Sequence, residues 1–143
     1  MSTTESDQAL IAILRENARL STAEIARRLG LSRTTVQSRI DRLEEKGVIA
    51  GYTLRLSEDY LTQAVRAHLL VTVAPKLAAK VEAGLRQLNG VRTLHSVSGS
   101  FDMIVIVEAQ SIQALDELID RVGLLEGVER TLSSIILSTR IDR

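Results

Sequence analysis

The sequence predicts an α+β protein with two domains, an N-terminal helix-turn-helix domain and a C-terminal ferredoxin-like βαββαβ domain. Three observations support this prediction. Apolar residues recur at helical spacing through the first 50 residues, the pattern changes to strand-like alternation after residue 64, and arginines concentrate on one short segment. A chain of 143 residues is long enough for two small domains. We expect them at 1–50 and 64–143, joined by a strand and hinge over 51–63.

Composition excludes several classes of protein. Apolar residues make up 45% of the chain, which favours a folded protein over a disordered one. Cysteine is absent, so disulfides, thiolate nucleophiles and cysteine-based zinc sites are excluded. No apolar run approaches the ~20 residues of a membrane-spanning helix, and the first five residues do not resemble a secretory signal. We therefore expect a cytoplasmic protein with no membrane partner, no metal and no cofactor.

Two helices are predicted before residue 30. The first carries apolar residues at helical spacing. The second begins after Ser21, an N-cap residue that Glu24 would complete as a capping box. Gly30 follows at the position where a left-handed residue ends a helix. The apolar residues of these helices are Leu10, Ile11, Leu14 and Ala18, then Ile25, Ala26 and Leu29.

A third helix is predicted between Ser32, a second N-cap residue, and Gly47. Its apolar residues define one buried face. Because successive residues of a helix turn by about 100°, the polar residues between them lie on the opposite face. The buried face is Val36, Ile40 and Leu43, and the outer face is Thr34, Gln37, Ser38 and Asp41.

The second and third helices and their glycine turn are typical of a helix-turn-helix, whose second helix enters the major groove of DNA through its N-terminal half. Residues 27–42 contain five arginines and one aspartate, a net charge of +4, whereas the whole chain is neutral. The alternative is an ordinary three-helix cluster with a solvated basic face. We expect Ser32, Arg33, Thr34, Gln37 and Ser38 to reach the bases, and Arg27, Arg28, Arg39 and Arg42 to meet phosphates.

The pattern changes after the third helix. Residues 48–56 alternate loosely and predict a strand, and the polar residues 57–60 predict a loop or hinge. Further on, Pro75 suits the first turn of a helix, and Ser111 caps another in which Ile112, Leu115, Ile119 and Val122 face inward. Strands are predicted over 65–73, 91–97, 103–107 and 128–139, which completes the βαββαβ order.

The apolar strands of the second domain bear on assembly. Both helices of this topology cover one face of the sheet, yet residues 103–107 are apolar on both faces. The last strand likewise has Leu132 and Ile136 on one face, with Ile135 and Leu137 on the other. A second copy of the chain would bury the uncovered face, although a loop of the same chain is an alternative. A dimer would also supply two recognition helices for half-sites about 34 Å apart, or a multiple of that spacing.

Three segments of the sequence resemble a known family. Residues 20–52 look like the DNA-binding half of the Lrp/AsnC family, the leucine-responsive or feast/famine transcriptional regulators. Residues 97–103, Val-Ser-Gly-Ser-Phe-Asp-Met, resemble the glycine-to-aspartate effector-loop motif of that family, and residues 127–137 resemble its last strand. The resemblance covers nearly the whole chain in order. It is specific to the family rather than to one member.

This resemblance implies a winged helix-turn-helix domain followed by an effector domain called RAM. It also implies dimers formed by sheet-to-sheet packing, which assemble into tetramers or octamers and bind small molecules, usually amino acids, between RAM domains. Carried over by position, the effector site is Ser98, Gly99, Ser100 and Asp102, opposed by Thr131 and Ser133. Glycine would let backbone amides approach a carboxylate, and Asp102 would pair with an ammonium group. The alternative is a plain hairpin turn in which Asp102 bonds its own backbone.

The sequence disfavours two other functions. An enzyme is disfavoured because His68 and His95 have no partner at metal-ligand or triad spacing. An RNA-recognition module shares the βαββαβ order, but it needs aromatic residues that residues 103–107 lack. A metabolite-sensing or assembly module without operator-specific DNA binding remains the alternative.

Overall fold

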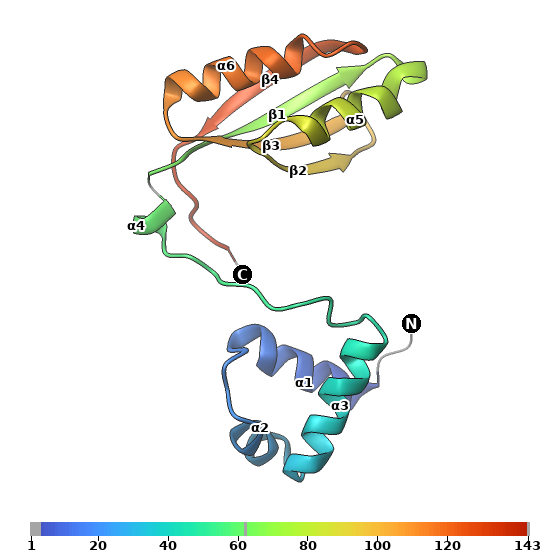
Figure 1. The fold of residues 1–143 in the computed structure, drawn as a ribbon, viewed down its shortest axis with the longest axis vertical. Helices are drawn as coiled ribbons and strands as arrows, with labels where there is room; N and C mark the ends of the chain where they lie inside the picture. The colour runs from blue at the N-terminus through green and yellow to red at the C-terminus, as the bar shows by residue number, and fades with distance from the viewer. Residues whose placement is uncertain (1–3, 62, 143) are drawn as a thin grey trace. The chain divides into compact units, whose positions relative to one another are not determined.

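The computed structural model of the chain describes residues 4–61 and 63–142. The chain forms two compact units, residues 1–55 and 56–143 (Figure 1). None of the described helices is both long and apolar enough to cross a membrane.

Three helices make the first unit: α1 (Glu5–Glu16), α2 (Thr22–Leu29) and α3 (Arg33–Glu45). Each contributes apolar side chains to one buried cluster, as the helical spacing predicts. α3 turns its predicted apolar face into this cluster, so its polar face is left to solvent. The buried members are Leu10, Ile25, Ala26, Val36, Ile40 and Leu43.

Side-chain caps fix where these helices begin. The Ser21 and Ser32 hydroxyls accept hydrogen bonds from the amides of Glu24 and Thr35, as predicted. The capping box predicted at Ser21 is wrong, because the Glu24 carboxylate binds arginines instead. A capping box does occur at the start of α1, between Thr4 and Asp7.

Gly30 sets the turn between α2 and α3. Its φ of 65° and ψ of 35° place it in the left-handed region, and its amide donates to the Ala26 carbonyl. A residue with a Cβ adopts this conformation only at a cost, so the glycine is required by the backbone. The predicted helix-turn-helix junction is confirmed.

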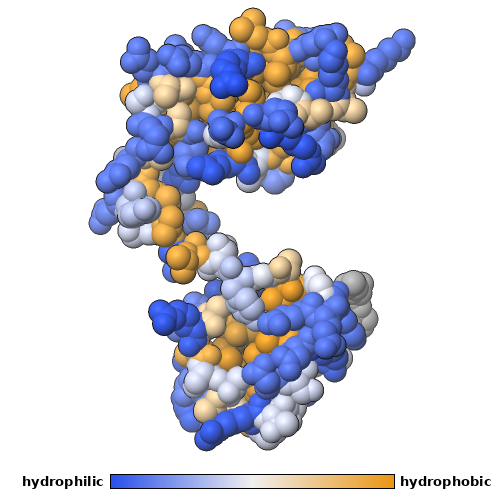
Figure 2. Space-filling view, in the orientation of Figure 1, coloured by the Kyte–Doolittle hydropathy of each residue, from blue (hydrophilic) through white to orange (hydrophobic). Residues whose placement is uncertain are grey.

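Two predictions for the connecting segment are wrong. Residues 48–56 do not form a strand, because the Val48 and Ile49 amides both donate to the Leu43 carbonyl at the end of α3 and no described strand pairs with the segment. The predicted loop at 57–60 instead contains a helical turn, α4 (Glu58–Leu61). Ser57 begins this turn, since its hydroxyl and carbonyl both accept from the Tyr60 amide. Exposed apolar side chains lie along the connecting segment (Figure 2).

The second unit confirms the predicted βαββαβ order. Its antiparallel sheet has the strand order β2-β3-β1-β4, and the two main helices cover one face of that sheet (Figure 1). A single 3-10 turn, η1 (Pro75–Leu77), leads into the first of these helices. The remaining elements are β1 (Val65–Val73), α5 (Ala78–Gln87), β2 (Val91–Ser96), β3 (Met103–Ala109), α6 (Ile112–Gly123) and β4 (Val128–Ile136).

The core of this unit lies between the helices and the sheet. Leu115 and Val122 of α6 are fully buried there and Ile119 is partly buried, as predicted. Ile112 does not face inward. It lies in the first turn of α6 and borders a shallow groove with Ile135 of β4, while Leu118 takes a core position. β4 ends at Ile136, short of the predicted Thr139.

The opposite face of the sheet is not covered by any described element of this unit. The strand registers pair Leu70 with both Ile104 and Leu132, and they pair His68 with Ile106. Paired residues share a face, so this open face carries a continuous apolar strip across three strands. Leu132 lies on the edge strand β4 and is 54% exposed. This open face of the sheet carries Leu70, Ile104, Ile106 and Leu132.

Candidate DNA-binding surface and effector site

α3 presents the outer face that its sequence predicts. Thr34, Gln37, Ser38 and Asp41 are all exposed, and with Arg42 and Glu45 they line a shallow hollow along the helix. The opposite face is held by three core side chains, so the rotation of α3 about its axis is fixed. The helix therefore offers an exposed polar face of the kind that enters a major groove.

Not all of the predicted base contacts are free in the protein. The Gln37 amide nitrogen donates to Asp41 Oδ1 at 2.7 Å, which holds the Gln37 side chain along the helix. Ser32 Oγ accepts from the Thr35 amide at 3.1 Å and also bonds the Thr35 hydroxyl, so it acts as a cap. Arg33, Thr34 and Ser38 are exposed.

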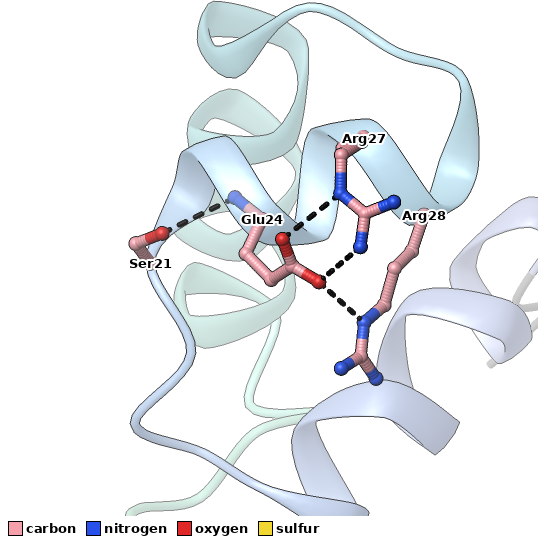
Figure 3. Close-up of polar contacts among 4 residues, drawn as sticks. All are labelled: Ser21, Glu24, Arg27 and Arg28. Carbon is pink, nitrogen blue, oxygen red and sulfur yellow. Dashed lines mark hydrogen bonds and ion pairs between the residues drawn. The ribbon is translucent and has the colours of Figure 1, made fainter.

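Arg27 and Arg28, the two arginines of α2 predicted to contact phosphates, both bind the carboxylate of Glu24 (Figure 3). Arg27 donates to both oxygens of Glu24, through Nε at 3.0 Å and Nη2 at 2.7 Å. Arg28 Nε donates to Glu24 Oε1 at 3.0 Å. Hydrogen bonds from Arg27, and next from Arg28, lower the pKa of Glu24 to about 2. Glu24 was not foreseen as a partner of these arginines.

The predicted phosphate contacts of α3 reach back to the start of α1. Arg42 Nη2 lies 2.7 Å from Asp7 Oδ1, and Arg39 donates to the Ser6 hydroxyl. The Asp7 side chain is only 6% exposed. Hydrogen bonding to Thr4 is the largest cause that lowers the pKa of Asp7, and Arg42 lowers it further, against the opposing effect of burial. Asp7 thus joins two helices in addition to capping its own.

The predicted effector loop is anchored to β1 by Asp102. Its Oδ2 accepts from the Val73 amide at 2.9 Å, its amide donates to the Val71 carbonyl, and its carbonyl accepts from the Val97 amide. Asp102 therefore bonds a neighbouring strand rather than only its own turn. Gly99 has a φ of 111°, and Ser98, Gly99 and Ser100 are exposed.

The residues predicted to oppose this loop, Thr131 and Ser133, lie on β4, which pairs with the other side of β1. Thr131 is paired with Val71 on one side of β1, and Asp102 bonds Val71 on the other side. Ser133 is two pairs further along β4, opposite Leu69. The structure thus brings Asp102 and Thr131 to the same level of the sheet, with β1 between them.

A contact that the sequence did not indicate joins the loop to β4. The guanidinium carbon of Arg130 lies 5.2 Å from the centre of the Phe101 ring, within the range of a cation–π interaction. Phe101 precedes Asp102 and Arg130 precedes Thr131 in the sequence, so the contact joins the neighbours of two predicted site residues. Among the described residues, no group of three or more histidine, aspartate or glutamate side chains could hold a metal ion.

Both units match known protein families. Residues 3–50 match a family described as winged helix-turn-helix DNA-binding, and residues 66–143 match the Lrp/AsnC ligand binding domain. The HTH-type transcriptional regulator LrpA of Pyrococcus horikoshii is 33% identical over 134 residues, which covers 93% of this chain and 95% of that protein. LrpA of Mycobacterium tuberculosis is 34% identical over 134 residues and covers 93% and 89%, respectively.

Solved structures agree with these matches. AsnC of Escherichia coli superposes with a TM-score of 0.88 at 25% identity, covering 100% of this chain and 97% of that one. The feast or famine regulatory protein of M. tuberculosis, solved with L-methionine, gives a TM-score of 0.87 at 32% identity and covers 99% and 96%. The relatives are transcriptional regulators rather than enzymes. This chain belongs to the Lrp/AsnC family of DNA-binding transcriptional regulators.

Proposed function

We propose that this regulator reads duplex DNA with the exposed face of α3 and is modulated by an amino acid bound in its second unit. The observation that carries the DNA-binding part is the fixed rotation of α3. Its apolar face is buried, so Thr34, Gln37 and Ser38 point to solvent together with Arg33. In this proposal these residues and Ser32 face the bases. Arg27, Arg28, Arg39 and Arg42 contribute positive charge for the phosphates on either side.

Two substitutions test the division between base and phosphate contacts. Gln37→Ala is expected to relax preference at one base position, with a loss of about 1–3 kcal/mol of discrimination. Arg39→Ala is expected to weaken binding to all sequences alike and to reduce the slope of log K against log salt by about 1. Selection from a random duplex library, followed by titrations at several salt concentrations, measures both. Unchanged binding by either variant would show that its role is misassigned.

We infer that the effector is a free amino acid held near Ser98, Gly99, Ser100 and Asp102, with Thr131 and Ser133 nearby. Asp102 supports this because Oδ2 is used by the Val73 amide, whereas Oδ1 makes no hydrogen bond among the described residues. That oxygen suits an ammonium group, and the backbone amides of the exposed residues around Gly99 suit a carboxylate. The M. tuberculosis relative was solved with L-methionine, which makes this amino acid the first to test.

Calorimetry with L-methionine and the other common amino acids tests the effector site. Asp102→Asn is the informative variant, because the amide oxygen of asparagine can still accept from the Val73 amide while the negative charge is lost. We expect Asp102→Asn to weaken effector binding by at least about tenfold, as for a lost charge-assisted hydrogen bond. Full binding by a folded Asp102→Asn variant would place the site elsewhere.

We further propose that two copies pack through the open face and that such dimers assemble into tetramers or octamers. The apolar strip that includes Leu70 and Ile104 supports this, since apolar strips of this kind are usually buried in an interface. A symmetric dimer would present two α3 helices to two DNA half-sites. Because its proposed target is duplex DNA, we propose that it acts in the cytoplasm.

A further inference from the structure

The carboxylate of Glu24 occupies the Nε–Nη2 edge of Arg27 and the Nε of Arg28, two arginines that we place among the phosphate contacts (Figure 3). Arg27 binds it through two parallel hydrogen bonds, the same arrangement that a guanidinium forms with a phosphate group. Arg28 shares one of its oxygens. Glu24 therefore takes, within the protein, a place that a DNA phosphate oxygen would otherwise take.

The cluster is built into α2 and needs no other element. Glu24 lies three residues before Arg27 and four before Arg28, a spacing that places all three side chains on one face of the helix. The backbone of Glu24 is fixed independently, because its amide donates to the Ser21 hydroxyl. Replacing the Glu24 side chain would therefore leave the N-cap of α2 in place.

The cluster is also accessible and permanently charged. The Arg27 side chain is 73% exposed and that of Arg28 is 39% exposed, so phosphate oxygens can reach both. The pKa of Glu24 is about 2, so its carboxylate stays ionised near neutral pH. The three side chains together carry a charge of +1 rather than the +2 of two free arginines. A phosphate must displace the carboxylate to use the Nε–Nη2 edge of Arg27 or the Nε of Arg28.

We propose that Glu24 is an internal competitor of DNA phosphates, which weakens the binding of Arg27 and Arg28 to every duplex alike. It limits the part of the affinity that depends on salt and not on sequence, so that the base contacts of α3 have more influence on where the protein binds. This inference rests on the proposed DNA-binding surface.

Titration of an arbitrary duplex of about three helical turns, by fluorescence anisotropy at several salt concentrations, tests the proposal. We expect Glu24→Gln to raise affinity by roughly three- to tenfold at about 50 mM salt and to steepen the slope of log K against log salt by about 1 to 2. Glu16→Gln is the matched control. It removes one exposed negative charge from the same unit, and Glu16 makes no ion pair among the described residues. It should change affinity by less than about twofold.

A second comparison isolates the arginines. In a chain that already carries Arg27→Ala and Arg28→Ala, adding Glu24→Gln should change duplex affinity no more than Glu16→Gln does. An equal rise in that background, equal effects of Glu24→Gln and Glu16→Gln, or weaker binding by Glu24→Gln would each overturn the proposal. Circular dichroism confirms that the variants are folded. If the parent protein binds duplexes and Arg39→Ala weakens that binding, any of these three overturning outcomes refutes only the role of Glu24. If the parent binds no duplex, the DNA-binding surface fails as well.

Discussion

Asp7 and Arg42 show how single residues of the first unit tie its helices together. The two side chains are 35 residues apart in sequence, and their 2.7 Å contact joins the start of α1 to α3. The second carboxylate oxygen of Asp7 accepts from the Thr4 amide. Arg42 therefore has a role in stability that is separate from any contact with phosphate.

Arg42→Ala should destabilise the first unit. The substitution leaves the poorly exposed Asp7 carboxylate without its guanidinium partner, and a charge in that position is costly unless paired. We expect the midpoint of thermal unfolding to fall by a few degrees, as seen by circular dichroism. Arg33→Ala is the control, since Arg33 is exposed and makes no hydrogen bond or ion pair among the described residues. Equal midpoints for the two variants would contradict a structural role for Arg42.

Asp7 also predicts how stability depends on pH. Its pKa is lowered in the folded chain from 3.8, so the unfolded chain binds a proton more readily. The stabilisation from Asp7 is therefore fully present above about pH 4 to 5 and is lost as the pH falls below that range. Glu24, with a pKa lowered from 4.5 to about 2, acts in the same direction.

Urea unfolding between neutral pH and pH 2.5 checks this dependence. The parent should lose stability steeply below pH 4, whereas Asp7→Asn should start less stable and lose less over that interval. A parallel decline in both proteins would show that Asp7 does not carry the effect.

The sequence predicted the serine N-caps, but it predicted neither the ion pairs of Glu24 with Arg27 and Arg28 nor the contacts between distant residues. The hydroxyls of Ser21 and Ser32 accept hydrogen bonds from amides only three residues away, so these N-caps can be recognised from the sequence. The bonds of Asp7 to Arg42 and of Asp102 to Val73 depend on how elements pack, and no short motif encodes them.

At the scale of elements, the turn between α2 and α3 depends on one glycine. Gly30 has a positive φ, and a Cβ built on it would meet no other atom within 4 Å. The cost of replacing it is therefore conformational rather than a clash. Gly30→Ala should lower the free energy of unfolding by about 1–2 kcal/mol.

Gly51→Ala is the matched control for that prediction. A Cβ at Gly51 also meets nothing within 4 Å, and its φ is not in the left-handed region. Chemical unfolding should show a loss for Gly30→Ala and little change or a slight gain for Gly51→Ala. A similar loss in both variants would mean that the positive φ of Gly30 does not decide the outcome.

The elements that were mispredicted share a cause. The 48–56 segment has the composition of a strand, but a strand needs a neighbour, and its first amides are already used to close α3. Ile112 has the right spacing for an inward position, yet it is the first residue of α6, where its side chain reaches only a surface groove. Periodicity predicts which face of an element is apolar but not what lies opposite each residue.

At the scale of the whole molecule, the βαββαβ order of the second unit could be predicted because its strands and helices follow one another in a pattern that allows few topologies. The open face was predicted from the same strands. Residues 103–107 are apolar at every position, and the structure covers only Met103, Val105 and Val107. Ile104 and Ile106 lie on the open face, so the sequence encodes a surface that one copy of the chain leaves uncovered.

Charge placed on the open face should therefore separate the copies. Leu132→Lys introduces one ammonium group per chain, and in a symmetric dimer both would be buried in an apolar interface. We expect the dissociation constant of the dimer to rise by at least about tenfold in sedimentation experiments, with the fold retained, because Leu132 is already half exposed within one chain. Ile112→Lys is the control, since Ile112 is 64% exposed on the helix-covered side. Dissociation by Ile112→Lys but not by Leu132→Lys would place the interface on the helices, and a parent chain that is monomeric at micromolar concentration would refute self-association through either face.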